Sequence, residues 1–247
     1  MILALFADVH ANLEAFTACL SHVKERSPDG YAFVGDLVGY GADPAAVVDI
    51  VRALADRGAV VVRGNHDAAV VKQGSDTMHA AAEEAIQWTR GQLSAPQLAF
   101  LETLPLTARK DDLFFVHGSA EAPADWIYVT DSTRAWHSMN FAEATYVLSG
   151  HVHEPVLYYT GASQKPTPFC PIPGVPIPVP RRRRWLAIIG AAGQPRDGNT
   201  AACYALLDTV RATLTFHRVP YDWPSAAAKI RAAGLPERFA ARLGRGE

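Results

Sequence analysis

The sequence is poor in cysteine, almost neutral, and free of long apolar runs. Its three cysteines, Cys19, Cys170 and Cys203, lie far apart in a spacing that does not bind metals, which is typical of a reducing compartment. A net charge of −2 at pH 7 gives no electrostatic reason to expect nucleic acid or an anionic membrane as partner. The first seven residues lack the basic flank of a signal peptide, and the apolar stretch 185–193 is too short to span a bilayer. These absences predict a cytoplasmic protein that uses neither a membrane nor nucleic acid.

The remaining composition is that of an ordinary globular protein. Hydrophobic residues make up 49% and charged residues 19% of the 247 residues, so a large buried core is expected. No internal repeat or linker divides the chain, and we expect one domain over residues 1–247, with the number of subunits left open. One segment, 162–184, is different, because it contains seven prolines followed by four arginines at 181–184. It predicts an extended, polyproline-like excursion.

The function of this proline and arginine segment has two interpretations. The prolines could cover a site or an interface between subunits, or they could form an ordinary rigid surface loop. The arginines could bind a polyphosphate or a nucleic acid, but a solvated basic loop is the more common use of such a run, and we favour it.

The first 62 residues alternate between apolar runs and amphipathic segments. Strands are predicted at 2–7, 31–34 and 59–62, with one helix after each of the first two strands. Two consecutive β-α-β units imply parallel strands with right-handed crossovers, and hence an α/β fold. The carboxyl ends of all three strands should therefore meet at one edge of the sheet.

The rest of the chain predicts a second set of elements. We expect helices between residues 76 and 104, a hairpin, a helix from about 131, a strand at 145–148, three further strands, and two short helices at the end. The hairpin and the three later strands are predicted at 107–116, 185–189, 201–207 and 213–218.

Polar residues with metal-binding side chains follow these predicted strands. Two carboxylates, one amide and four imidazoles lie at strand ends, namely Asp8, His10, Asp36, Asn65, His117, His151 and His153. This mixture suits Mn, Fe, Co, Ni or Zn, whereas magnesium and calcium prefer shells of oxygen alone. Seven ligands are too many for one tetrahedral ion and suit two ions that share a bridging carboxylate.

Five sequence blocks together resemble the calcineurin-like metallophosphoesterase superfamily. They are Asp8-x-His10, Gly35-Asp36, Gly64-Asn65-His66-Asp67, His117 and Gly150-His151-x-His153, and they occur in the order found in the family. A further block, residues 193–197, resembles small prokaryotic phosphodiesterases of the YfcE and archaeal type. The resemblance implies a four-layer α/β/β/α sandwich of two mixed sheets flanked by helices.

The resemblance also implies a role for each of these residues. Asp8, His10 and His153 would bind one divalent ion, Asn65, His117 and His151 the other, and Asp36 both, with manganese favoured. The implied reaction is hydrolysis of small phosphodiesters or phosphomonoesters by in-line attack of a metal-bridging hydroxide. His66 would donate a proton to the leaving oxygen or stabilise its charge, and Asp67 would orient the His66 ring.

One departure from the family pattern bears on the substrate. Tyr40 stands where phosphoprotein phosphatases of the superfamily carry an arginine that binds phosphate, which favours a small phosphodiester or a nucleotide over a phosphoserine. Whether Arg63 reaches the substrate is open. In the block 193–197 the polar side chains could contact substrate, but Pro195 and Gly198 favour a turn.

Two alternative functions are compatible with the sequence. One is a phosphoprotein phosphatase or a dinucleotide polyphosphate hydrolase. The other is a non-catalytic interaction module on the same fold, similar to the retromer subunit, although the intact ligand set and His66 argue for an enzyme. The remaining histidines follow no strand-end motif and are expected not to bind metal, namely His22, His79, His137 and His217.

Overall fold

Two mixed β-sheets of six strands each form the centre of the molecule. The computed structural model describes residues 1–72, 78, 80–161 and 165–247. In the first sheet the strands follow the order β3 (Val60–Val62), β2 (Gly30–Val34), β1 (Ile2–Phe6), β11 (Ala202–Asp208), β12 (Thr213–Val219) and β9 (Ile177–Pro178). In the second sheet the order is β4 (Thr107–Lys110), β5 (Leu113–Val116), β6 (Tyr146–Ser149), β10 (Trp185–Ile188), β7 (Val156–Thr160) and β8 (Pro166–Phe169).

Strands β1, β2 and β3 are parallel, as the alternation of the sequence predicts. Leu5 pairs with Ala32, and Phe33 pairs with Val61, so the carboxyl ends of the three strands lie at one edge. Helix α1 (Leu13–Lys24) connects β1 to β2, and α2 (Pro44–Ala55) connects β2 to β3. The side chain of Asn12 accepts a hydrogen bond from the backbone N–H of Ala15 and caps α1.

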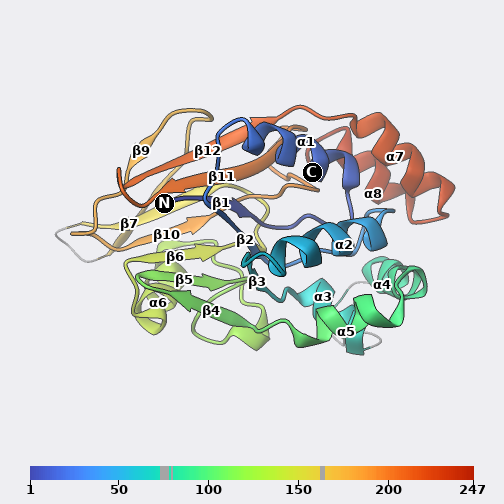
Figure 1. Ribbon diagram of the computed structural model, residues 1–247, viewed down its shortest axis with the longest axis horizontal. Coiled ribbons are helices and arrows are strands. Elements are labelled where there is room, and N and C mark those ends of the chain that lie inside the picture. Colours follow the sequence, from blue (N-terminus) through green and yellow to red (C-terminus); the bar gives the residue numbers. More distant parts are fainter. Residues whose placement is uncertain (73–77, 79, 162–164) are drawn as a thin grey trace.

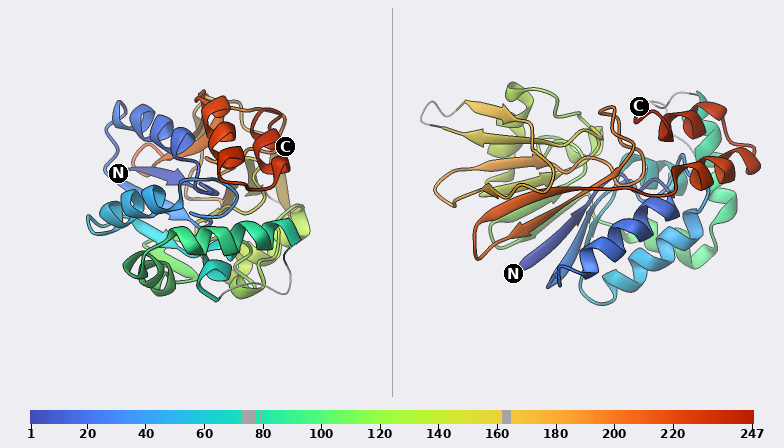
Figure 2. Two further views of the ribbon diagram at one scale, coloured as in Figure 1. Left: turned by 90° about the vertical axis from the view of Figure 1, so that its right-hand side faces the viewer. Right: turned by 90° about the horizontal axis from the view of Figure 1, so that it is seen from above.

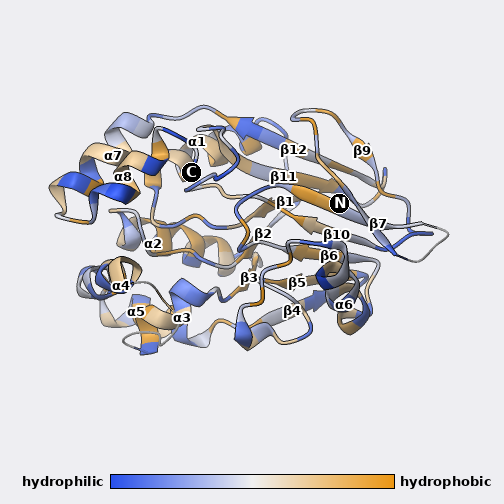
Figure 3. Ribbon diagram, turned by 180° about the vertical axis from the view of Figure 1, so that it is seen from behind, coloured by the Kyte–Doolittle hydropathy of each residue, from blue (hydrophilic) through white to orange (hydrophobic). Residues whose placement is uncertain are grey.

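The layers follow the predicted α/β/β/α order. Helices α1 and α2 cover the outer face of the first sheet, and α6 (Ser132–Ala142) covers the outer face of the second (Figure 2). Figure 3 shows that strand β1 is hydrophobic over most of its length, as expected for a strand that is buried on both faces. The fold class expected from the family resemblance is therefore confirmed.

Separate apolar cores hold the layers together. Between the helices and the first sheet, the Phe6 ring stacks on Phe33 and Tyr204 at centroid distances of 5.4 and 5.5 Å, and Phe16 of α1 meets Phe6 edge-on. Between the sheets, alternate residues of β1 such as Leu5 pack toward the second sheet. Since successive side chains of a strand point to opposite faces, β1 contributes to both cores.

Five further helices lie around the carboxyl ends of β1, β2 and β3 (Figure 1). They are α3 (Asn65–Lys72), α4 (Ala80–Gln92), α5 (Ala95–Thr103), α7 (Trp223–Ala232) and α8 (Glu237–Leu243). Lys229 of α7 lies 2.6 Å from the Glu14 carboxylate and 2.9 Å from that of Asp43, so it ties α7 to α1 and to the start of α2. In the described part of the chain, no helix is both long and apolar enough to cross a membrane.

Helix α3 begins within the Gly-Asn-His-Asp motif. The motif follows β3 directly, and Asn65 is the first residue of the helix. The Asp67 carboxylate accepts a hydrogen bond of 2.9 Å from the backbone N–H of Gly64, three residues earlier, so the motif caps its own helix. Helices are also expected between residues 76 and 104. Residues 76, 77 and 79 of this region lie outside the described residues.

The proline-rich segment does not reach the carboxyl ends of the parallel strands. It contributes β8 and β9, each at the edge of a sheet, where proline costs no ladder hydrogen bond. Ile177 of β9 pairs with Leu214, which lies across from Leu207 and hence near the start of β1. Residues 165–184 of the segment therefore extend the edges of both sheets, at the end of the molecule opposite the strand ends.

The arginines that follow make contacts inside the molecule. Arg181 lies 2.7 Å from the Asp112 carboxylate, Arg183 lies over the Tyr159 ring, and Arg184 donates to the side chain of Asn140. These contacts lie on the second sheet and α6, away from the carboxyl ends of β1 to β3.

Candidate metal centre

The seven predicted ligands converge at the edge where the two sheets meet. Atoms of Asp8, His10 and His153 lie within 4.8 Å of one another, and so do atoms of Asp36, His117 and His151. Six of the seven side chains are almost completely buried, and Asn65 is half-buried. The Asn65 side-chain oxygen lies 3.1 Å from Nε2 of His117 and joins the second cluster.

Two backbone features bring the ligands this close. Several of the ligands have left-handed backbone conformations with φ from 47° to 68°, namely Asp8, His10, Asp36, His151 and His153. Such conformations cost on the order of 1–3 kcal/mol each and persist only where surrounding contacts hold them. At Gly64 a side chain would collide with the Asp36 carboxylate, so glycine is needed there for close approach.

Each of the four imidazoles is fixed by a backbone carbonyl. Nδ1 of His10, His117 and His153 lies 3.1, 2.8 and 2.7 Å from the carbonyl oxygens of Val38, Val34 and Gln194, respectively. Nε2 of His151 lies 2.9 Å from the carbonyl oxygen of Trp126. Because a carbonyl only accepts, the ring nitrogen that faces it carries the proton, and in a neutral ring the other nitrogen carries a lone pair.

These lone pairs face one another across short distances. Nε2 of His10 lies 3.2 Å from Nε2 of His153, and Nε2 of His117 lies 3.1 Å from Nδ1 of His151. Two lone pairs at this distance repel, whereas a cation placed between them would bind both. The donor set therefore fits a metal ion in each cluster, and backbone-fixed imidazoles are the usual support of such sites.

Asp36 lies between the clusters. Its Oδ2 is 3.3 Å from Nε2 of His117 and 3.7 Å from Nε2 of His10, while its Oδ1 accepts the backbone N–H of His66 at 2.9 Å. Asp8 lies on one side only, 3.4 Å from Nε2 of His153. The position of Asp36 is the one that a carboxylate shared by two ions requires.

Burial and charge shift the proton affinities of these groups in opposite directions. Burial would raise the pKa of Asp36, but the neighbouring His117 holds it well below its usual value. Burial would also lower the pKa of His117, yet the Asp36 carboxylate raises it to about 9. Burial lowers the pKa of His10 and His153 well below the usual value and that of His151 to about 3, so these three rings are neutral.

His66 lies beside the centre, with its ring 4.9 Å from that of His10 and 4.4 Å from that of Tyr40. Its Nδ1 is buried and has no hydrogen-bond partner within the described ranges. Burial lowers the pKa of His66 to about 4, so the ring is neutral at pH 7.

Asp67 differs from its predicted role. Its Oδ1 accepts the backbone N–H groups of Leu37 and Val38 at 2.9 and 3.2 Å, and its Oδ2 accepts that of Gly64. In the described structure its hydrogen bonds do not include His66. The carboxylate therefore fixes the loop after β2 to the start of α3, because those backbone donors would otherwise be buried without an acceptor.

Three of the other histidines lie away from the two ligand clusters. His22 contacts the Tyr204 hydroxyl at 2.6 Å, His217 stacks on the Tyr204 ring, and His137 lies 3.5 Å from Glu121. His79 falls outside the described residues. Arg63 donates to the backbone carbonyl of Glu102 on the α5 side.

Sequence reasoning missed several contributors to the site. Trp126 fixes His151 through its carbonyl, and the Tyr128 ring stacks on His151 at a centroid distance of 3.7 Å. Both belong to an irregular loop with no periodic pattern. Arg196 was assigned to a turn, but its guanidinium carbon lies 5.8 Å from the centre of the Tyr40 ring, next to the metal centre. The motif at 193–197 was the available signal.

The two buried imidazole–carboxylate clusters fit the donor set of a metallohydrolase with two ions. Residues 1–212 match the family model of the calcineurin-like phosphoesterase superfamily domain. The chain belongs to this superfamily and is a metal-dependent phosphoesterase-type hydrolase.

Individual relatives extend over the whole chain. An uncharacterized protein of Methanocaldococcus jannaschii is 30% identical, covering 98% of this chain and 97% of its own. A metallophosphoesterase from Sphaerobacter thermophilus is 36% identical in sequence, and its crystal structure matches with a TM-score of 0.88. The match covers 100% of this chain and 99% of that chain. A hypothetical protein from Pyrococcus horikoshii shares the fold at 19% identity, with a TM-score of 0.79. The match covers 100% of this chain and 98% of that chain.

We predict that Asp36→Asn lowers metal content from two ions per chain to one or none, because it removes the charge that both clusters share. Elemental analysis of manganese-loaded, gel-filtered protein measures this. Asp112→Asn, at the opposite end of the second sheet, is the matched control and should keep two ions. Full dual occupancy in Asp36→Asn would rule out the shared carboxylate.

We predict that metal affinity rises with pH. In metal-stripped protein, a His117 pKa of about 9 and an Asp8 pKa raised by burial to about 7 keep protons on two ligands near neutrality. A metal ion must displace these protons, so affinity increases by up to about tenfold per pH unit and per proton, and levels off above pH 9. Calorimetric titration with manganese between pH 6 and 9 measures it, and a flat profile would refute the assignment.

Proposed function

We propose that this protein hydrolyses small phosphate esters, either phosphodiesters or phosphomonoesters, with two divalent metal ions. The observation that carries the proposal is the convergence of four backbone-fixed imidazoles on two carboxylates and one amide. Two ions bound there would supply Lewis acidity and a nucleophilic hydroxide for in-line attack on phosphorus. The mixed imidazole and oxygen donors suit the borderline ions Mn, Fe, Co, Ni and Zn, and among these the family resemblance favours manganese.

The ligands divide into two sets in this proposal. Asp8, His10 and His153 hold one ion, and Asn65, His117 and His151 hold the other, which follows the two clusters of short distances. Asp36 contributes to both. Since both sheets supply ligands, the site depends on the packing of one sheet on the other.

His66 is the proposed catalytic residue that does not bind metal. Its buried ring is neutral at pH 7, so it can offer an N–H to the leaving oxygen as negative charge develops there. The ring is held by contact with His10 and Tyr40, and by the hydrogen bond from its backbone to Asp36. Asp67 acts on the loop that supports this arrangement.

A non-catalytic interaction module is the less favoured alternative. It has no need for seven buried ligands, for imidazole tautomers fixed by carbonyls, or for strained backbone at five of the ligands. Buried polar groups of this kind are retained where they bind something.

The test of this function is a comparison of two esters across several metals. We predict that metal-stripped protein gains hydrolysis of p-nitrophenyl phosphate, bis-p-nitrophenyl phosphate or both with added manganese, and less with nickel, zinc or magnesium. Release of p-nitrophenol measures the rates, and their ratio separates monoesterase from diesterase. If no ester were cleaved with any of the four metals, the proposed function would fail.

We predict that His66→Ala keeps two metal ions but lowers kcat by a factor of roughly 10²–10⁴, because the leaving oxygen loses its hydrogen-bond donor. His137→Ala, which removes an imidazole outside the centre, is the control and should leave kcat unchanged. Elemental analysis and p-nitrophenol release give the two readouts. Wild-type turnover by the His66 variant would exclude the role.

A further inference from the structure

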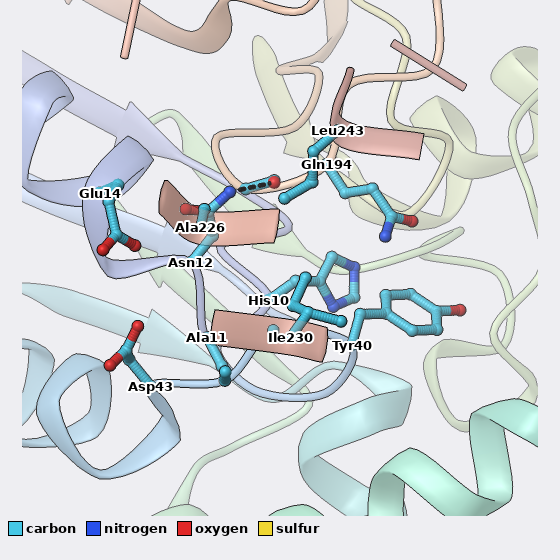
Figure 4. A pocket seen from close by; sticks show the side chains of 13 residues that line it. His10, Ala11, Asn12, Glu14, Tyr40, Asp43, Gln194, Ala226, Ile230 and Leu243 are labelled. Atoms are coloured by element: carbon cyan, nitrogen blue, oxygen red, sulfur yellow. Dashed lines mark hydrogen bonds between the residues drawn. The ribbon is translucent and has the colours of Figure 1, made fainter. Parts of the chain in front are cut away.

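Arg196 lies at the edge of the metal centre. It follows Gln194, whose carbonyl fixes His153, and its guanidinium carbon is 5.8 Å from the centre of the Tyr40 ring. The Tyr40 ring in turn lies 4.6 Å from that of His10 and 4.4 Å from that of His66. Figure 4 shows Tyr40, His10 and Gln194 together on one side of a pocket, with Glu14 and Asp43 on the other side.

One buried donor of Arg196 has no partner in the described part of the chain. A terminal nitrogen donates to the side-chain oxygen of Gln194 at 3.0 Å, and a side-chain hydrogen bond joins Arg196 to Tyr40, whereas Nε is buried and has no partner among the described residues. The adjacent carboxylate, Asp197, pairs with Arg218 instead. A guanidinium carries five N–H groups, and buried donors are rarely left without an acceptor unless a ligand supplies one.

A second arginine approaches from the C-terminal helix. Arg242 of α8 is half-buried, and it makes no ion pair within 4 Å among the residues the structure describes. Burial lowers the pKa of Arg242, and the positive charge of Arg196 lowers it further. Neither guanidinium has a carboxylate within 4 Å among the described residues, and an anion bound to both would offset the repulsion between their charges.

Other cationic side chains around the centre are already engaged. Lys229 is bound by Glu14 and Asp43, and Arg218 is bound by Asp197. Arg63 also has a buried Nε without a partner among the described residues, but it donates to a backbone carbonyl of α5, whereas Arg196 lies over the Tyr40 ring beside the metal centre. Arg196 and Arg242 therefore stand apart from these three, and both lie on the side of the centre where Tyr40 meets the α8 residue Phe239 at 4.7 Å.

We propose that Arg196 and Arg242, beside the Tyr40 ring, form a subsite for a dianionic, non-esterified phosphate group of the substrate. Two guanidinium groups match the charge of such a group, and the planar fork of arginine suits bidentate contact with phosphate oxygens. The inference rests on the proposed phosphoesterase function and refines its substrate class. The phosphate is either the scissile group of a monoester or a second phosphate on a diester.

This subsite also changes the meaning of Tyr40. By sequence, the lack of an arginine at position 40 favours a small phosphodiester or a nucleotide over a phosphoserine. The structure places Arg196, from the loop between β10 and β11, over the ring of Tyr40. The ring at position 40 therefore lies against a guanidinium that comes from elsewhere in the chain, and its tyrosine no longer argues against a phosphoserine.

The test compares Arg196→Gln and Arg242→Gln with wild type on two pairs of probes, in each of which one probe carries a dianionic phosphate and the other does not. If the subsite holds the scissile group, kcat/KM for p-nitrophenyl phosphate falls roughly 10–100-fold, mainly through KM, while bis-p-nitrophenyl phosphate changes less than about threefold. The second pair of probes is the p-nitrophenyl ester of thymidine 5′-phosphate with and without a 3′-phosphate. If the subsite holds a second phosphate, the 3′-phosphate raises kcat/KM in wild type and not in the variants. Either result supports the subsite, and equal effects on both pairs of probes would overturn it.

A binding measurement separates this inference from the proposed function. Calorimetric titration of metal-stripped protein with pyrophosphate should show binding at least about tenfold weaker in Arg196→Gln, with partial recovery in Arg196→Lys. Arg211→Gln is the control, because it removes one exposed charge at the β11–β12 turn near the start of β1. Unchanged pyrophosphate binding in Arg196→Gln and Arg242→Gln would refute the subsite, even if wild type hydrolyses no ester.

Discussion

The metal centre depends on a positive charge that offsets the repulsion between imidazole lone pairs. These lone pairs are held about as close as hydrogen-bonded atoms. In each cluster two ring nitrogens face each other at 3.1–3.2 Å, while backbone carbonyls take the protons on the far side of the rings. A fold tolerates this only when a cation, or a proton on one ring, compensates. The Asp36 carboxylate raises the pKa of His117 to about 9, so this ring gains a proton when no cation is bound.

The surrounding architecture serves to maintain this arrangement. The first sheet presents Asp8, His10 and Asp36 at the ends of parallel strands, and the second sheet presents His117, His151 and His153 from the opposite side. The apolar core between the sheets, with Leu5 and Phe115 fully buried, fixes the distance between these two sets. Asp67 and Lys229 then secure the loops and the C-terminal helices around the centre.

The part of the site that lies on the first sheet was predictable from the residues themselves. Apolar runs that end in Asp8 and Asp36, with helices between them, predict parallel strands whose ends meet at one edge. That His117, His151 and His153 face the same point does not follow from periodicity, since it requires the packing of two sheets. The family resemblance supplied this layering, and the structure confirms it.

The parts that sequence reasoning missed share a physical cause, because each depends on contacts between segments distant in sequence. Asp67 was assigned to His66 by adjacency, yet buried backbone donors from the neighbouring loop take its carboxylate. Tyr128 and Trp126 lie in a loop without a repeating pattern, and Arg196 follows a proline that indicated a turn. Strands β8 and β9 were hidden by proline, which an edge strand accepts.

The most direct test of the central claim is anomalous diffraction from crystals of the manganese-loaded protein. We predict two peaks per chain, roughly 3.5–4 Å apart, with Asp36 between them. One peak should lie among Asp8, His10 and His153, and the other among Asn65, His117 and His151. A single peak, or peaks away from these side chains, would contradict the account.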